Sequence, residues 1–139
     1  MGVRILTAVA ALGLLFSAAL AASEAPAGAE LYFISPADGA SLKSPVTIQF
    51  GLRGMGVAPA GIELPATGHH HLLIDTALPA LDQPIPADAK HLHFGKGQTE
   101  VQLELSPGKH TLQLLLGDYL HQPHQPPVVS KQISITIEP

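Results

Sequence analysis

The feature that most constrains the fold of this chain is an alternation of apolar and polar residues that recurs in short segments. In the segment 46–52, the apolar residues Val46, Ile48, Phe50 and Leu52 occupy every second position. A period of two is typical of a β-strand that buries one face and exposes the other. Beyond the N-terminal apolar stretch, no segment has a convincing helical period and no internal repeat is visible. The pattern therefore predicts an all-β fold.

Turn residues separate the segments that carry this pattern. Glycine and proline are frequent in the stretches 54–68 and 76–90, which have no apolar period and are predicted to be connections. About seven short strands with turns between them are typical of an immunoglobulin-like antiparallel β-sandwich. The chain lacks the cysteine pair and the tryptophan of antibody domains, so the prediction is of the general architecture only. The predicted strands cover residues 31–34, 46–52, 69–75, 91–94, 99–105, 110–116 and 131–137.

The N-terminus has the pattern of a secretory signal peptide. Arg4 precedes an apolar run that ends at Leu20, and Ala19-Leu20-Ala21 supplies the small residues after which signal peptidase cuts. The run is shorter than the roughly 20 apolar residues that a membrane-spanning helix needs. We therefore expect a periplasmic or secreted protein with no membrane span after cleavage. In this prediction, residues 1–21 are the signal peptide, residues 22–30 are a flexible leader, and residues 31–139 form one immunoglobulin-like domain.

The composition excludes several classes of partner. The formal net charge is −4, and it becomes −5 if Arg4 leaves with the signal peptide. The six lysines and arginines that remain are scattered, whereas binding of nucleic acid requires a clustered basic surface. The chain also has no basic amphipathic helix for a membrane surface. Because it has no cysteine, stability must come from core packing, with a bound metal as a further source.

Histidine is concentrated in a way that suggests a metal site. Seven of the eight histidines lie in three short groups, and the absence of cysteine leaves imidazole as the main ligand for a transition metal. Zn²⁺ and Cu²⁺ usually take three or four nitrogen ligands of this kind. The groups are His69-His70-His71, His91-Leu92-His93 and His121-Gln122-Pro123-His124.

The direction of the predicted strands brings the three groups to one end of the sandwich. If the strand 46–52 runs toward that end, then the strand 69–75 begins there and the strand 91–94 finishes there. The strand 110–116 also runs toward it, into the loop that carries the third group. His110, at the start of that strand, is expected to lie at the opposite end.

Alternation along each strand assigns different roles to neighbouring histidines. His69 and His71 share one face of their strand, whereas His70 shares the other face with Leu72 and Ile74. We therefore expect His70 to be a partly buried, hydrogen-bonded structural residue. The candidate metal ligands are His69, His71, His91, His93, His121 and His124, and the candidates for hydrogen bonding to a ligand are His70, Glu100 and Asp118.

The signatures of several enzymes are missing from the sequence. It has no Gly-x-Ser-x-Gly motif and no cysteine nucleophile. We therefore expect no enzymatic activity. The hypothesis is a domain that binds Cu(II), or else Zn(II), for metal handling or delivery. The alternative is a metal-free interaction module whose histidine-rich end binds a periplasmic protein or a small ligand.

Several motifs together resemble one family of bacterial secreted domains, DUF4399. They include Gly68-His-His-His-Leu-Leu-Ile-Asp75, His91-Leu-His-Phe-Gly-Lys-Gly-Gln-Thr-Glu100 and Gly117-Asp-Tyr-Leu-His-Gln-Pro-His124. The resemblance spans nearly all of the chain after the predicted signal peptide. The resemblance implies a small exported domain that is periplasmic in Gram-negative cells. It does not imply any particular activity. It also implies that one shared feature contains His69, His70, His71, His93, Gln98, Thr99, Glu100, Asp118, His121 and His124.

Overall fold

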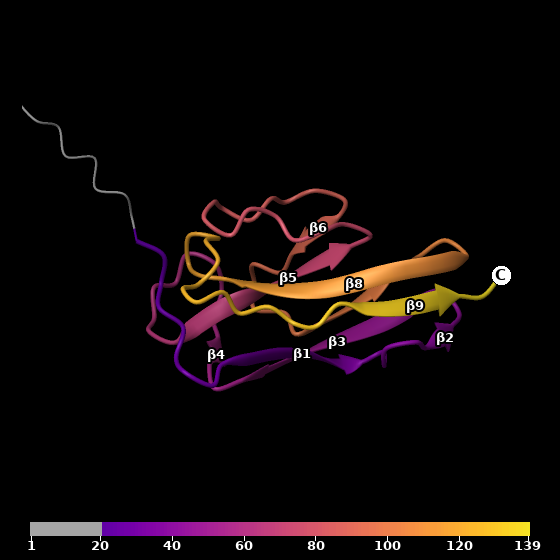
Figure 1. The fold of residues 1–139 in the computed structure, drawn as a ribbon, viewed down its shortest axis with the longest axis horizontal. Coiled ribbons are helices and arrows are strands. Elements are labelled where there is room, and N and C mark those ends of the chain that lie inside the picture. The colour runs from indigo at the N-terminus through magenta and orange to yellow at the C-terminus, as the bar shows by residue number, and fades with distance from the viewer. Residues whose placement is uncertain (1–20) are drawn as a thin grey trace, which may run out of the picture.

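The structure, a computed structural model, describes residues 21–139, so the predicted signal peptide lies outside the described residues except for Ala21. Strands in these residues form two sheets, which Figure 1 shows as two layers, so the predicted all-β sandwich is confirmed. The strands are β1 (Glu30–Ser35), β2 (Ser41–Leu42), β3 (Val46–Arg53), β4 (Gly56–Val57), β5 (Thr67–Ile74), β6 (His91–His93), β7 (Glu100–Leu103), β8 (Gly108–Gly117) and β9 (Ile133–Ile137).

The smaller sheet has three strands in the order β1-β3-β7. Both pairs are antiparallel, with Phe33 opposite Phe50 and Ile48 opposite Val101. The larger sheet has the order β2-β9-β8-β5-β4, and β6 also pairs with β5. Strand β5 therefore pairs with β8 along one side, and along the other side with β4 at its start and with β6 from His71 onward.

The main core lies between the two sheets and follows the predicted alternation. Ile48 from β3 and Leu72 from β5 are completely buried, as are Leu112 and Leu114 from β8. Burying an aliphatic side chain of this size contributes roughly 1.5–3 kcal/mol relative to exposure. Packing of these faces is what holds β5 and β8 in register.

A second, smaller apolar cluster covers the outer face of the larger sheet. It consists of Leu73, Leu115 and Ile85, with Leu81 and Val129 packed against it. Ile85 and Leu81 belong to the long connection between β5 and β6, which therefore acts as a cover for this face. Because of this cover, side chains on the outer face of β5 are buried too.

The structure differs from the predicted elements in two respects. The two-residue strands β2 and β4 are additional, and both pair in parallel; segments this short carry no measurable period. The predicted flexible leader also lies against the sandwich, where Ala25 is buried and its N–H donates to the Gln125 carbonyl over 3.0 Å. In the described part of the chain, no helix has the length and hydrophobicity needed to cross a membrane.

Candidate metal centre

Strand β5 carries two histidines that point to the outer face of the larger sheet. His69 and His71 lie on the same face as Leu73, are fully buried, and have ring centroids 4.7 Å apart. Gly117, the partner of His69 on β8, leaves room for the second ring, because a Cβ atom there would lie 2.7 Å from His71 Cε1. The pairing of β5 with β8 and the space left by this glycine keep both imidazoles on the outer face.

A third histidine comes from the neighbouring strand β6. His93 pairs with His71, and its Nε2 atom lies 3.2 Å from Nε2 of His69. The ligand nitrogens of these three residues all lie within 4.8 Å of one another, so the group could hold a metal ion. Two nitrogens at about 2.1 Å from one ion with a tetrahedral angle would be about 3.4 Å apart. The separation of the His69 and His93 nitrogens matches that spacing.

His93 differs from His69 and His71 in its exposure. It lies at the surface, whereas His69 and His71 are fully buried. Its ring lies over Gly95, where a Cβ atom would collide with the imidazole. The group is therefore buried on the β5 side and open on the β6 side.

The loop after β8 adds a fourth imidazole beside this group. The ring centroid of His121 lies 4.7 Å from that of His93, 5.1 Å from that of His69 and 6.2 Å from that of His71. His121 has a left-handed backbone with φ of 65°, which is uncommon for a residue other than glycine. Such a conformation persists only where surrounding contacts hold it.

The cluster favours neutral imidazoles. Burial, followed by the neighbouring His93 and His121, lowers the pKa of His69 to about 4. Burial and the same kind of repulsion lower the pKa of His71 to about 3, and burial followed by His121 lowers the pKa of His93. A metal ion binds the neutral form of imidazole. The ligands are therefore in their binding form at neutral pH.

Two of the buried imidazoles have uncommitted nitrogens. Among the described residues, Nδ1 of His69 and both ring nitrogens of His71 have no hydrogen-bond partner. A buried polar atom without a partner costs about 1–3 kcal/mol. His69 faces His93 through Nε2, so coordination would use that atom of His69 and one of the free nitrogens of His71. Coordination through His71 would offset part of the cost, so the donor set fits a metal.

His70 faces the opposite side of β5, as its place in the alternation predicts. It is fully buried, and its ring centroid lies 5.1 Å from that of Phe50 in the main core. The expected hydrogen bond is missing, since neither ring nitrogen has a partner within residues 21–139. Burial lowers the pKa of His70 to about 4. The strand thus separates His70 from the metal cluster.

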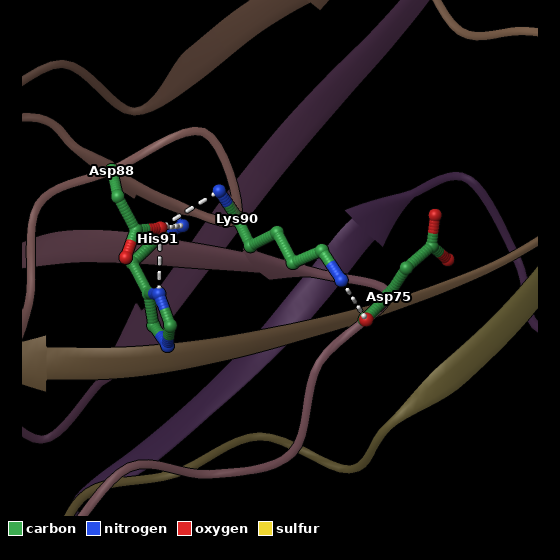
Figure 2. Close-up of polar contacts among 4 residues, drawn as sticks. All are labelled: Asp75, Asp88, Lys90 and His91. Atoms are coloured by element: carbon green, nitrogen blue, oxygen red, sulfur yellow. Dashed lines mark hydrogen bonds and ion pairs between the residues drawn. The ribbon is translucent and has the colours of Figure 1, made fainter.

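The structure places His91 away from the cluster. Its Nδ1 atom donates to Asp88 Oδ1 over 2.8 Å, as Figure 2 shows, and the same carboxylate oxygen accepts the N–H groups of Lys90 and His91. Lys90 Nζ reaches the Asp75 carbonyl oxygen at 3.5 Å on the other side. The sequence predicts His91 as a candidate metal ligand, but it is not in the group whose nitrogens lie within 4.8 Å of one another, and its Nδ1 atom is bonded to Asp88 instead.

Two more predicted residues lie outside the cluster. His124 is buried beside Gly68, and its Nε2 donates to the Thr67 carbonyl over 3.0 Å. Gly68 lies on the inner face of β5, which is why His124 does not join the outer group. Glu100 is exposed on β7 in the other sheet, where it accepts a hydrogen bond from Gln49.

Asp118 has a different role from the one its position in the sequence suggests. Burial alone would raise its pKa, but hydrogen bonds from Gln122, Ser23 and Leu120 outweigh burial and lower the pKa of Asp118 below its ordinary value. These four bonds, two from Ser23 and one each from Leu120 and Gln122, occupy both carboxylate oxygens, so Asp118 shapes the loop that carries His121.

His110 lies at the far end of β8, as strand direction predicts. It binds the Asp75 carboxylate at the end of β5, 2.7 Å from Oδ2. No pattern in the sequence points to three other residues that shape the site, which are Ser23, Gly95 and Gly117. Their roles depend on contacts between segments distant in the chain, which a local pattern does not encode.

Comparison with known proteins gives one result. A family model described as a domain of unknown function (DUF4399) matches residues 48–138, which include every histidine of the cluster. No curated protein and no solved structure matches the chain.

Proposed function

Since the chain belongs to the DUF4399 family, whose description records no function, we propose from the site itself that this protein is a periplasmic domain that binds one divalent transition metal. The observation that carries the proposal is the grouping of His69, His71 and His93, whose ligand nitrogens lie within 4.8 Å of one another. His121 lies beside them as a further nitrogen donor.

The chemistry of the donors limits the choice of metal. Thiolate is absent from the sequence, and the one methionine beyond the signal peptide, Met55, packs against the main core. Imidazole alone suits Cu(II) and Zn(II), whereas Cu(I) prefers sulfur ligands. We infer that Cu(II) or Zn(II) is the ion, with Cu(II) favoured in an exported protein.

We infer that the protein handles or delivers this ion and does not use it for catalysis. Ligands that are fixed on paired strands and open on one side suit capture and transfer of an ion. The apolar cluster of Leu73, Ile85 and Leu115 lies on the same face as the histidines, and the Asp118 carboxylate has both oxygens engaged in hydrogen bonds. A general base for catalysis would need a free carboxylate or imidazole in reach of substrate. Export to the periplasm rests on the signal-peptide pattern.

A second candidate is a metal-free interaction module that uses the same end of the molecule. Two observations favour it: Ile62 and Leu64 are more than half exposed, and they line a cavity of about 480 Å³ together with Tyr119, close to His121 in the chain. Such a surface suits a partner protein. The test below separates the two candidates.

The proposal predicts stoichiometric, stabilising binding of metal by protein without an affinity tag. One Zn(II) or Cu(II) ion per chain should raise the unfolding free energy by about 2.7 kcal/mol when free metal is 100 times Kd. His69→Ala and His93→Ala should each abolish this gain, while His110→Ala, far from the cluster, should retain it. The measurements are isothermal titration and thermal unfolding. Weak uptake of several ions without stabilisation would leave the interaction module as the better function.

A further inference from the structure

We propose that Ser23 and Asp118 are positioning residues that hold His121 as the fourth nitrogen ligand of the metal. This inference rests on the proposed function and adds to it the device that completes the site. It assigns a task to the segment before β1, which is hydrogen-bonded to the histidine-bearing loop.

The Asp118 carboxylate fixes the shape of the loop. Its Oδ1 atom accepts the N–H groups of Leu120 at 2.9 Å and Gln122 at 3.0 Å, the two residues on either side of His121. The Asp118 main chain adds two bonds, because its N–H donates to the Gln122 carbonyl and its carbonyl accepts the His121 N–H. His121 is thereby held in its left-handed conformation at the centre of a closed turn.

Ser23 in turn fixes the Asp118 carboxylate. Its hydroxyl donates to Oδ2 over 2.9 Å and its N–H over 3.2 Å. The segment around Ser23 is tied down beyond this contact, since the Gln125 N–H donates to the Ser23 carbonyl over 2.9 Å and Ala25 is buried in the main core. Ser23 and Asp118 are 95 positions apart in the sequence. Together they form a strap between the N-terminal segment and the His121 loop.

The strap acts on His121, because the other three histidines are already held in place by paired strands. His69 and His71 lie on a strand that is hydrogen bonded on both sides, and His93 lies on a paired strand. His121 is the one member of the cluster carried by a loop, so its position depends on the bonds that shape that loop. Loss of a residue that orients a ligand typically weakens metal affinity by about 10–100-fold.

The experiment measures Zn(II) affinity by chelator competition and counts Cu(II)-bound nitrogens by electron paramagnetic resonance. Ser23→Ala and Asp118→Asn should each weaken Zn(II) binding about 10-fold or more. They should also remove one nitrogen from the Cu(II) spectrum. Ser23→Thr retains the hydroxyl and should keep wild-type affinity. In a His121→Ala background, neither substitution should weaken binding further, because the ligand on which they act is gone.

The matched control is Asp38→Asn. Asp38, in the turn between β1 and β2, also pins a distant segment, because its carboxylate accepts the main-chain N–H of Ser134 on β9 over 2.8 Å. Asp38→Asn should leave metal affinity unchanged. If Asp118→Asn does not fold, the Ser23→Ala and Ser23→Thr pair decides the matter.

Three results would overturn the strap. Wild-type affinity in Ser23→Ala, with metal binding by the wild-type protein intact, would remove the strap and leave the proposed function standing. An equal loss in the His121→Ala background would show that Ser23 acts elsewhere. Absence of stoichiometric metal binding by the wild-type protein would overturn the function and the strap together.

Discussion

His70 lies between two members of the histidine cluster, His69 and His71, and yet belongs to a different environment. Side chains that are adjacent on a strand point to opposite faces, so His70 packs against Phe50 inside the sandwich. Two buried ring nitrogens without partners in the described structure weaken the core at this position. A residue of this kind lowers stability without a compensating contact, which makes it a clear target for substitution.

Replacement of His70 by leucine should stabilise the protein. The apolar side chain has a similar volume and removes two unpartnered polar atoms, so the free energy of unfolding at pH 7 should rise by about 1–3 kcal/mol. Metal affinity should not change, because His70 faces away from the cluster. Urea denaturation and zinc titration measure the two quantities. A large loss of stability in His70→Leu would mean that the imidazole has a partner in solution, such as buried water.

The pairing of β5 with β8 ends in a polar clamp. Asp75 follows β5, and its carboxylate accepts Nδ1 of His110 at 2.7 Å and the Thr111 N–H at 2.8 Å. The second ring nitrogen of His110 donates to the Ser106 carbonyl over 2.8 Å. These bonds, first that to Ser106 and then that to Asp75, raise the pKa of His110 above its ordinary value. Both ring nitrogens act as donors, which is the arrangement of the charged imidazole.

The clamp should make part of the sheet's stability depend on pH. Because the folded pKa of His110 is raised above 6.5, its contribution is fully present below pH 6.5 and is lost as pH rises through the folded value. His110→Gln should therefore cost more stability at pH 5.5 than at pH 8. We expect a difference of at most about 1 kcal/mol, because 41% of the Asp75 side chain is exposed. An equal cost at both pH values in chemical denaturation would contradict a charged clamp.

At the scale of the whole molecule, the two faces of the larger sheet differ in what covers them. The inner face meets the three-stranded sheet, and the outer face meets the connection between β5 and β6. Both covers bury histidine, so His69, His70 and His71 all have lowered pKa values of about 4, 4 and 3. Strand β5 therefore buries three consecutive imidazoles in their neutral form.

The metal-free protein should therefore lose stability in mild acid. Each folded pKa lies below the unfolded value of 6.5, so the unfolded state binds more protons, and stability falls as pH drops from 6.5 toward 4. For His70 alone the full change is about 3 kcal/mol. The unfolding temperature should fall by roughly 10 °C or more between pH 7 and pH 5. In His70→Leu, stability should depend less on pH over this range. An unchanged dependence in that variant would contradict the lowered pKa of His70.

Local patterns predict the sandwich and the meeting of the histidine groups, because both follow from alternation and strand direction. They do not predict which group members join the cluster. His91 is drawn to Asp88 by a turn within its own connection, and His124 meets the inner face of β5 at Gly68. Glu100 lies in the other sheet. Side-chain orientation in loops depends on contacts with distant segments, as Ser23 and Asp118 illustrate. A local pattern of residues does not reveal such contacts.

The three consecutive histidines of β5 also affect how the sheet assembles. A slip of one residue against β8 would turn His69 and His71 into the core and His70 alone toward the outer face. A misaligned strand would therefore present one imidazole on the outer face, whereas the correctly aligned strand presents two. A metal ion present during folding would bind the aligned sheet more tightly than the slipped one. Correct strand pairing and a competent site would then be selected in the same step.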